Sequence, residues 1–428
     1  LFIEEVRNAS LKAMDLRLDD LVVIVDEAHN LPDRVRMGMQ RKLTPTMVRN
    51  AASEVEEHLG NMQRVAEING EMNASIMVKS WSLSVCKEFR LILAREFRRM
   101  LSELENSDEM IIQADSVLSW LNEAFDAVSA IANQSTLTGN EPALITPDKN
   151  VRVKMFKHLL ETNEVDIDED GDNEPSAHLL AHLIDVLTRF GSGPAMCLVF
   201  EGEGKDGRIV SHLLDAGLVA GPIFERTAGA ILMSGTLDPP HMFADLLGLD
   251  KEDRGESIHP SPFAKERRPI VVASDVTTLY RERGPDNTKK IREHIYNLVQ
   301  NTPGNVAVFA PSYSILNDIF ETISIPGVKK MVEARTWTKK DISALMIDLE
   351  EAPKVGRPIL LAGVFNGKLS EGIDYAGGLL DSVACVGIPN APPSVFQKSF
   401  GNYIKDKFGA TNHWRYANSQ PAINSILQ

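Results

Sequence analysis

Two adjacent carboxylates, Asp26 and Glu27, directly follow an apolar run in the stretch LVVIVDEAHNLPDR at residues 21–34. The run Leu21–Val25 is rich in β-branched residues, which predicts a strand buried on both faces of a parallel sheet. In open α/β sheets the chemistry lies just beyond the carboxyl ends of the strands. At that position Asp26 can hold Mg²⁺ through its water shell, while Glu27 takes a proton from an attacking water.

The residues after the acidic pair separate this site from an ordinary helix cap. Asp26 alone, ahead of Pro32, could simply cap a helix, because acidic residues are common at helix starts. An apolar strand that ends in D-E-A-H-N is instead typical of the Walker B element of helicase-type ATPases, the DEAH box. Ala28 and His29 therefore join the acidic pair as candidate nucleotide-site residues.

Small hydroxyl residues follow another predicted strand, Ala230–Met233, in the string Ser234, Gly235 and Thr236. If this strand lies in the same sheet as Leu21–Val25, its end brings two hydroxyls and a flexible backbone beside the acidic pair. The two hydroxyls could then sense whether a γ-phosphate is present at the acidic pair and relay that information to other parts of the protein. By itself S-G-T is an ordinary turn, so this interpretation depends on the DEAH box upstream.

The last part of the chain alternates strands with amphipathic helices, which predicts a second parallel sheet with right-handed crossovers. The strand candidates are Pro269–Ala273, Asn305–Ala310, Ile359–Gly363 and Val383–Ile388. Ser312 and Tyr313 stand at the tip of the second candidate. After the third comes GKLSEGIDY at residues 367–375, where two glycines would let the backbone approach a phosphate closely.

Between the DEAH box and the S-G-T string, the apolar spacing from Thr44 to Arg189 predicts antiparallel helices. Arg95, Arg98 and Arg99 lie on the charged face of one of them, where they either touch a nucleic-acid phosphate or form a solvated surface.

The pattern divides the chain into four segments. Residues 1–40 end a first motor domain and carry the DEAH strand, and residues 41–192 form a helical insertion. Residues 193–262 return to the first motor domain, and residues 263–428 form the second.

Composition fits a globular protein of two or three domains, with 43% apolar and 25% charged residues among 428. No apolar run is long enough to span a bilayer, and no membrane partner is expected. The three cysteines, Cys86, Cys197 and Cys385, are far apart and suggest neither a disulfide framework nor a metal knuckle. A reducing, intracellular setting fits best.

The net charge of −15 would argue against a nucleic-acid partner, but the charge is unevenly distributed. From His259 onward there are 20 basic and 16 acidic residues, whereas the preceding part has 25 basic and 44 acidic residues. A basic groove on the C-terminal part is therefore permitted.

A phosphate-cradling Walker A loop, G-x-x-x-x-G-K-[ST], is missing from the sequence. The nearest string, Gly363–Leu369, is one residue too short, and Leu369 has no hydroxyl for Mg²⁺. We therefore expect the chain to be a fragment of a longer protein and to hydrolyse no ATP by itself.

Four motifs occur in a fixed order: DEAHN at 26–30, MSGTLDP at 233–239, VFAPSYS at 308–314 and GKLSEGIDY at 367–375. Together they resemble the XPD helicases, iron–sulfur members of helicase superfamily 2. The resemblance implies an α/β fold of two RecA-like parallel-sheet motor domains with a helical arch insertion. It also implies an ATP-dependent DNA helicase that moves 5′ to 3′ on single-stranded DNA in nucleotide excision repair.

The resemblance also implies residue roles, with Glu27 as base, Asp26 as the Mg²⁺ ligand through water, and His29 as the link to the S-G-T string. The residues implied at the nucleotide are Asp26, Glu27, Ala28, His29 and Asp374. The residues implied in coupling are Ser234, Gly235 and Thr236. The residues implied at DNA are Ser312, Tyr313, Lys368, Ser370 and Glu371.

ATP and Mg²⁺ are the implied cofactors, and the family also carries a [4Fe-4S] cluster whose four cysteines are not in this chain. Single-stranded DNA is the implied partner, with repair and transcription-factor proteins as further partners, and we expect a monomer. The net charge and the lack of a eukaryotic-length arch favour an archaeal, cytoplasmic type over a nuclear one.

Two other interpretations stay open. The parent protein could be a DinG-type iron–sulfur helicase, which would differ in partners rather than in chemistry. It could also be a non-catalytic DNA-binding or scaffold module, which the missing phosphate loop favours and the intact acidic pair opposes.

Overall fold

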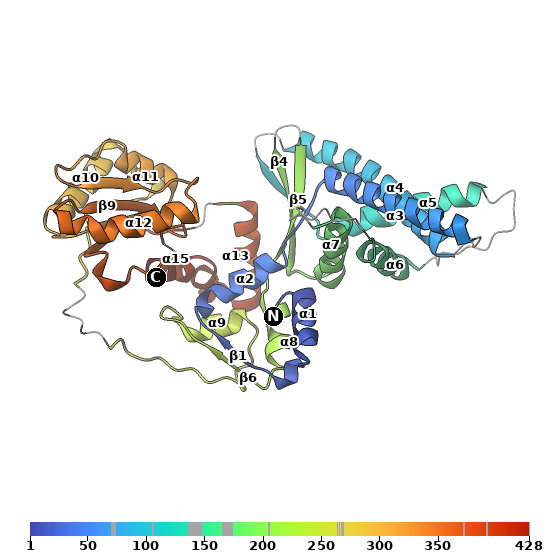
Figure 1. The fold of residues 1–428 in the computed structure, drawn as a ribbon, viewed down its shortest axis with the longest axis horizontal. Coiled ribbons are helices and arrows are strands. Elements are labelled where there is room, and N and C mark those ends of the chain that lie inside the picture. Colours follow the sequence, from blue (N-terminus) through green and yellow to red (C-terminus); the bar gives the residue numbers. More distant parts are fainter. Residues whose placement is uncertain are drawn as a thin grey trace.

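A computed structural model describes most of the chain as an α/β protein, with three sheets among the described residues. In Figure 1 a lobe of long helices lies at one end and a second α/β lobe at the other, with the C-terminal helices between them. The described residues are 1–69, 74–104, 107–135, 148–164, 174–203, 206–262, 264, 266, 269–370, 373–390 and 393–427.

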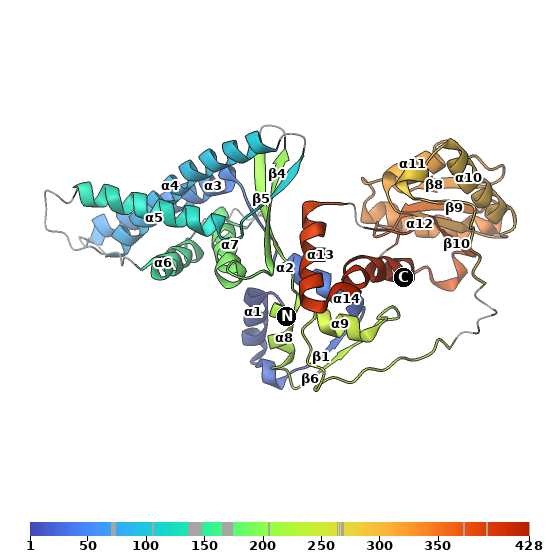
Figure 2. The same cartoon turned by 180° about the vertical axis from the view of Figure 1, so that it is seen from behind.

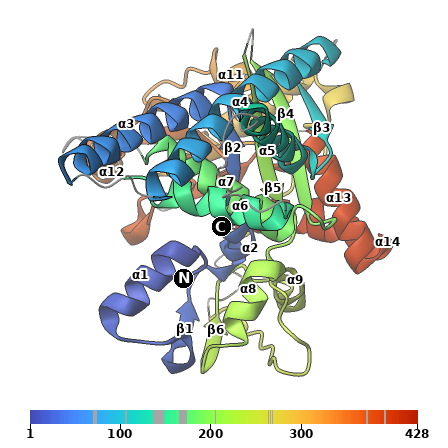
Figure 3. The same cartoon turned by 90° about the vertical axis from the view of Figure 1, so that its right-hand side faces the viewer.

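The DEAH strand, β1 (Val22–Val25), pairs in parallel with β6 (Gly229–Leu232) in a sheet of two strands. Val22 and Ile24 are 64% and 62% exposed, while the alternate side chains pack against the core. The prediction of a strand buried on both faces is therefore wrong in the described structure, because core residues cover only one face of the pair. In Figure 3 this pair lies with α1 (Glu4–Met14), α8 (Gly217–Phe224) and α9 (Pro240–Leu246).

Helices make up most of the described part of the elongated lobe, as the apolar spacing predicted (Figure 1). They are α3 (Pro45–Asn69), α4 (Ala74–Glu103), α5 (Ser116–Ser135), α6 (Lys149–Glu161) and α7 (Ser176–Phe190). Three aromatic rings join α4, α5 and α6: Trp81 stacks on Phe125 at 5.5 Å, and Phe156 meets both rings edge-on. Such pairs add to the hydrophobic gain from burying the rings.

An antiparallel sheet, which the sequence did not predict, lies at the base of this lobe. Its order is β2-β5-β4-β3, and its strands are β2 (Arg41–Leu43), β3 (Glu109–Ile112), β4 (Met196–Glu203) and β5 (Asp206–Leu213). The sheet therefore joins strands from both sides of the expected boundary at residue 192.

The second α/β lobe contains a parallel sheet of order β10-β7-β9-β8, covered by helices. Its strands are β7 (Val306–Ala310), β8 (Lys329–Val332), β9 (Ile359–Val364) and β10 (Ser382–Cys385). Its helices are α10 (Pro285–Gln300), α11 (Tyr313–Phe320) and α12 (Lys339–Glu351). Three of the four strand predictions for this region are confirmed, and β8 was missed.

The fourth strand prediction, Pro269–Ala273, is wrong. The segment forms no strand, and Ile270, Val271 and Val272 are 87%, 92% and 80% exposed. A β-branched run becomes a strand only when a neighbour supplies ladder hydrogen bonds, and no described segment does so here.

The C-terminal helices pack against the first part of the chain. They are α13 (Val395–Phe408), α14 (Ala410–Trp414) and α15 (Gln420–Leu427), and Figure 2 shows α13 and α14 beside α9. Tyr403 Oη and Lys407 Nζ both donate to Asp215 Oδ2, at 2.6 and 2.7 Å, and Tyr416 Oη donates to Asp245 Oδ2 at 3.0 Å. In the part of the chain that the structure describes, every helix is too short or too polar to cross a bilayer.

A buried lysine ties α4 to the end of α6. Lys79 is 3% exposed, and its Nζ donates to the carbonyl oxygen of Leu159 at 2.9 Å, among the last carbonyls of α6. A cation at a helix C-terminus complements the helix dipole. Burial nevertheless lowers the pKa of Lys79 from 10.5 to about 8.

The shifted pKa of Lys79 makes the stability of this lobe depend on pH. Between about pH 8 and 10.5 the unfolded chain keeps a proton that the folded chain releases, so folding becomes more favourable as pH rises. We predict that the free energy of unfolding of the wild type, minus that of Lys79→Met, increases by roughly 1–3 kcal/mol over this range.

Urea unfolding of both proteins at several pH values measures this difference, and buried Cys86, present in both, largely cancels. Lys154→Met, which removes an exposed lysine of α6, serves as the control and should give a difference independent of pH. A flat difference for Lys79→Met would show that the folded and unfolded pKa values of Lys79 are alike.

Candidate active site

Backbone hydrogen bonds continue the β1–β6 pairing beyond the strands and bring the two motifs together. The Met233 N–H donates to the Val25 carbonyl at 2.9 Å, and the Ala28 N–H donates to the Met233 carbonyl at 3.0 Å. The DEAH box and the S-G-T string therefore lie side by side. The predicted neighbourhood of these motifs in one sheet is confirmed.

Four side chains form one hydrogen-bonded cluster at this edge. Ser234 Oγ donates to Glu27 Oε2 at 3.0 Å and lies 2.7 Å from His29 Nδ1. Thr236 Oγ1 lies 3.1 Å from the same His29 nitrogen and 3.3 Å from Ser234 Oγ. His29 Nδ1 also approaches Glu27 Oε2 at 3.2 Å.

The cluster determines which ring nitrogen of His29 carries a proton. The single hydroxyl proton of Ser234 goes to Glu27, and its oxygen already accepts from the Thr236 N–H at 3.1 Å. The 2.7 Å contact then requires His29 Nδ1 to be the donor. Ser234 Oγ thus donates once and accepts twice, so its hydrogen-bonding capacity is filled.

Exposure falls along the cluster from the carboxylate to the imidazole. The Glu27 side chain is 66% exposed, whereas the His29 side chain is 6% exposed and Thr236 is 8% exposed. Glu27 also has a positive φ of 50°, uncommon for a residue with a side chain. Asp26 is exposed beside it, and its Oδ1 accepts from the Glu27 N–H at 2.9 Å.

Asp26 and Glu27 suit a Mg²⁺ ion that is held mainly by water and substrate phosphates, because such an ion needs only one or two protein carboxylates. Across the described residues, no group of three His, Cys, Asp or Glu side chains could hold a metal ion by itself. Cys86 and Cys197 are buried, and Cys385 lies on the distant strand β10, so the cysteines of this chain do not fit a cluster.

The residues predicted to face DNA lie in the second lobe, and their side chains are held by intramolecular contacts. Ser312 caps α11 by accepting from the Ile315 N–H, and Ser370 Oγ accepts from the Gly367 N–H at 2.9 Å. Lys368 Nζ donates to the Arg335 and Trp337 carbonyls, and Tyr313 Oη donates to Glu333. Asp374 is exposed, and Glu371 lies outside the described residues.

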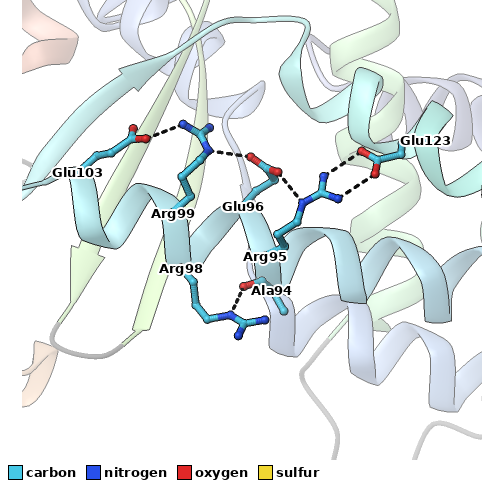
Figure 4. A network of polar contacts seen from close by, with 7 residues as sticks. All are labelled: Ala94, Arg95, Glu96, Arg98, Arg99, Glu103 and Glu123. Atoms are coloured by element: carbon cyan, nitrogen blue, oxygen red, sulfur yellow. Dashed lines mark hydrogen bonds and ion pairs between the residues drawn. The ribbon is translucent and has the colours of Figure 1, made fainter.

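Two of the four arginines of α4, Arg95 and Arg99, are paired with neighbouring carboxylates (Figure 4). Arg95 forms a bidentate pair with Glu123 at 2.9 and 3.0 Å and also contacts Glu96. Arg99 bridges Glu96 and Glu103. Arg98 instead donates to the Ala94 carbonyl and forms no ion pair within the described chain. These contacts favour the solvated-surface interpretation for Arg95 and Arg99.

The structure contains an aromatic cleft beside His29 that was not predicted from the sequence. It has a volume of about 610 Å³, and its walls come from α2 (Leu31–Gly38), the C-terminal helices and the loops of the second sheet. Arg36 lies 4.4 Å above the Phe400 ring, Phe396 stacks near Phe400, and His212 lies 4.5 Å from Phe396. The isolated aromatic residues gave no local pattern, so only the fold could reveal them.

The chain is similar to a helicase family model and to several ATP-dependent DNA helicases. Residues 295–428 match the model of the helicase C-terminal domain. The ATP-dependent DNA helicase CHL1 of Debaryomyces hansenii is 20% identical over 415 residues, covering 91% of this chain and 46% of the relative. The general transcription and DNA repair factor IIH helicase subunit XPD/RAD3 of Saccharomyces cerevisiae is 22% identical, covering 86% of this chain and 51% of the relative.

A solved XPD helicase structure shares the fold, with a TM-score of 0.51 and 19% identity over 100% of this chain and 64% of that one. The chain spans about half the length of the curated relatives. The matched family model, the helicase relatives and the shared fold make the chain similar to XPD-type helicases of superfamily 2. The α/β fold class expected from the motifs is confirmed. The archaeal type stays a prediction.

Thr236 offers a direct test of the cluster. Replacing it with the near-isosteric Val removes the hydroxyl that contacts both His29 and Ser234 in a buried place. We predict that Thr236→Val lowers the free energy of unfolding by about 1 kcal/mol, because the buried His29 Nδ1–H loses Thr236 Oγ1, the second acceptor that it shares with Ser234 Oγ. Urea unfolding measures this, and Thr236→Ser, which keeps the hydroxyl, should be closer to wild type. Equal losses in both variants would contradict the hydrogen-bond argument.

Proposed function

We propose that the protein to which this chain belongs is an ATP-dependent DNA helicase of the XPD type that acts in DNA repair. The observation that carries this proposal is the cluster of Glu27, His29, Ser234 and Thr236 at the joined ends of β1 and β6. Two of its relatives, an ATP-dependent DNA helicase and a helicase subunit of a DNA repair factor, support the same activity. Movement from 5′ to 3′ and nucleotide excision repair are part of the proposal.

In this proposal ATP and Mg²⁺ would bind at the exposed side of the acidic pair, and the bound ion would supply neutralisation of phosphate charge. Asp26 holds the ion through water, Glu27 accepts a proton from the attacking water, and Ala28 and Asp374 face the nucleotide. A proton on Glu27 would weaken its ability to accept from Ser234 Oγ. A weaker bond from Ser234 to Glu27 would also change the contacts that Ser234 makes with His29 and Thr236. Ser234 would in this way pass the protonation of Glu27 on to His29 and Thr236, and Gly235 is the residue between the two hydroxyl residues.

The proposed domain roles follow the segments expected from the sequence. Residues 1–40 and 193–262 serve the first motor, residues 41–192 the arch, and residues 263–428 the second motor. Closing and opening of the space between the motors would step the protein along a strand.

Single-stranded DNA would follow the cleft beside His29, since aromatic rings such as Phe396 provide stacking surfaces for unpaired bases. The loops expected at the strand carry Ser312, Tyr313, Lys368, Ser370 and Glu371.

We further propose that the protein works as a monomer with repair or transcription-factor partners, in the nucleus of a eukaryote or the cytoplasm of an archaeon. A [4Fe-4S] cluster would be held by residues outside this chain.

Glu27→Gln in the complete protein tests the proposed function. The amide keeps the size of the side chain and can still accept from Ser234, but it cannot take a proton from water. We predict that ATP hydrolysis falls by about 10² or more, while ATP binding survives. Hydrolysis is measured in the presence of single-stranded DNA, and binding with a fluorescent ATP analogue.

Glu225→Gln is the matched control, because it removes the charge of an exposed glutamate at the end of α8, away from the cluster. This variant should hydrolyse ATP like the wild type. Near-normal turnover in Glu27→Gln would remove Glu27 from the role of base, and a complete protein without DNA-stimulated hydrolysis would favour the scaffold alternative.

A further inference from the structure

A buried carboxylate outside the motifs organises the loops of the second sheet. Glu333 directly follows β8 at the carboxyl end of the parallel sheet, and it is 3% exposed. A buried carboxylate is costly unless hydrogen-bond donors surround it. Glu333 therefore needs partners, and they come from two motifs that are distant in sequence.

Three donors converge on Glu333. The Tyr313 hydroxyl donates to Oε1 at 2.8 Å, the Lys368 N–H donates to the same oxygen at 3.0 Å, and the Val364 N–H donates to Oε2 at 3.1 Å. Burial and the nearby carboxylate raise the pKa of Tyr313 to about 12, so the phenol keeps the proton that it donates. One side chain thus joins the start of α11, the end of β9 and the 367–375 loop.

The glycines of this region make room for the carboxylate. A Cβ atom on Gly363 would lie 2.9 Å from Glu333 Oε2, and a Cβ atom on Gly367 would lie 2.7 Å from Oε1. The Gly367 position would also meet the Val364 carbonyl oxygen at 2.8 Å. Close packing around Glu333 therefore accounts for glycine at both positions.

The segment after Glu333 strengthens the same junction. The Arg335 guanidinium lies 4.7 Å from the centre of the Tyr313 ring, and Lys368 Nζ donates to the Arg335 carbonyl at 2.7 Å and to the Trp337 carbonyl. The tip of β8 is consequently tied to Tyr313 on one side and to Lys368 on the other. Because Arg335 is exposed, the junction also presents a cation at the surface.

We propose that Glu333 is a positioning residue that holds the loop after β7 and the loop after β9 as one unit, so that both respond together when the motor changes state. The proposal rests on the helicase function proposed above. It adds a residue that belongs neither to the four motifs nor to the cluster of Glu27, His29, Ser234 and Thr236. Its effect is on coupling between ATP hydrolysis and strand movement rather than on hydrolysis itself.

Glu333→Gln breaks the junction with minimal change in shape. An amide offers one acceptor and one donor, so its NH₂ group must face either the Val364 N–H or the pair formed by Tyr313 and Lys368. Donor then faces donor, and one loop must move. Tyr313→Phe removes only one of the three donors and leaves both backbone contacts in place.

The experiment uses the complete protein and measures ATP hydrolysis without DNA, hydrolysis with DNA, strand separation and melting temperature side by side. For Glu333→Gln we expect strand separation to fall by about 10-fold or more, the usual effect of losing a hydrogen bond to a charged group, with hydrolysis without DNA within about 2-fold of wild type. Because Tyr313 is also proposed to lie at the strand, Tyr313→Phe is compared with Glu333→Gln by hydrogen exchange at the Val364 and Lys368 amides, where it should have the smaller effect. Gly367→Ala should reproduce the loss of strand separation with Glu333 present.

Glu321→Gln, an exposed glutamate at the end of α11, is the control for loss of one negative charge in this lobe. Proportional loss of all activities with a lower melting temperature in both Glu333→Gln and Gly367→Ala would overturn the proposal, and so would unchanged strand separation.

Hydrogen exchange at the Val364 and Lys368 amides gives a readout that does not depend on activity. Protection of both should fall in Glu333→Gln but not in Glu321→Gln, and unchanged protection would refute the junction. A wild-type protein that separates no strands would refute the proposed function, while the exchange result would still decide whether Glu333 holds the two loops.

Discussion

The parallel pairing of β1 with β6 is the constraint on which the candidate site depends. Two backbone hydrogen bonds beyond the strands, Met233 to Val25 and Ala28 to Met233, place the acidic pair beside the S-G-T hydroxyls. About 200 residues separate these motifs, and a large helical lobe lies between them in sequence. The lobe can be inserted there because its own antiparallel sheet, β2 to β5, gathers the chain before and after the helices at one place. The geometry of the site therefore depends only on the register in which β1 pairs with β6.

Two glutamates at the carboxyl ends of parallel strands, Glu27 and Glu333, differ in exposure and in hydrogen-bond partners. Glu27 is exposed and contacts a hydroxyl whose other partners are a histidine and a backbone N–H. Glu333 is buried among a phenol and two backbone N–H groups, all of which donate to its carboxylate. The same residue type at equivalent ends of two sheets thus provides a solvent-accessible carboxylate in one lobe and a buried structural contact in the other.

The sequence predicted that the DEAH box lies beside the S-G-T string, but it did not predict Glu333 or the short strands that hold the surrounding structure together. An apolar β-branched run followed by D-E or by S-G-T marks a strand and its functional end, so the β1–β6 neighbourhood followed from local pattern. The strand β8 was missed because Lys329 and Lys330 interrupt its apolar character, and with it the position of Glu333. The segment Pro269–Ala273 has the composition of a strand, but pairing depends on a partner that composition cannot supply. Strands β2 and β3 are only three and four residues long and lie between long helices, which hides their alternation.

The ion pairs on α4 have a consequence for how salt would affect nucleic-acid binding. Each phosphate that a protein neutralises with a free cation releases counterions, and this release gives binding its steep dependence on ionic strength. Arg95 and Arg99 already share their charge with Glu123, Glu96 and Glu103, so a phosphate would have to displace a carboxylate before any counterion is set free. Arg95 and Arg99 would consequently contribute little to the salt dependence of any nucleic-acid binding by this lobe, whereas Arg98, which forms no ion pair within the described chain, would contribute more.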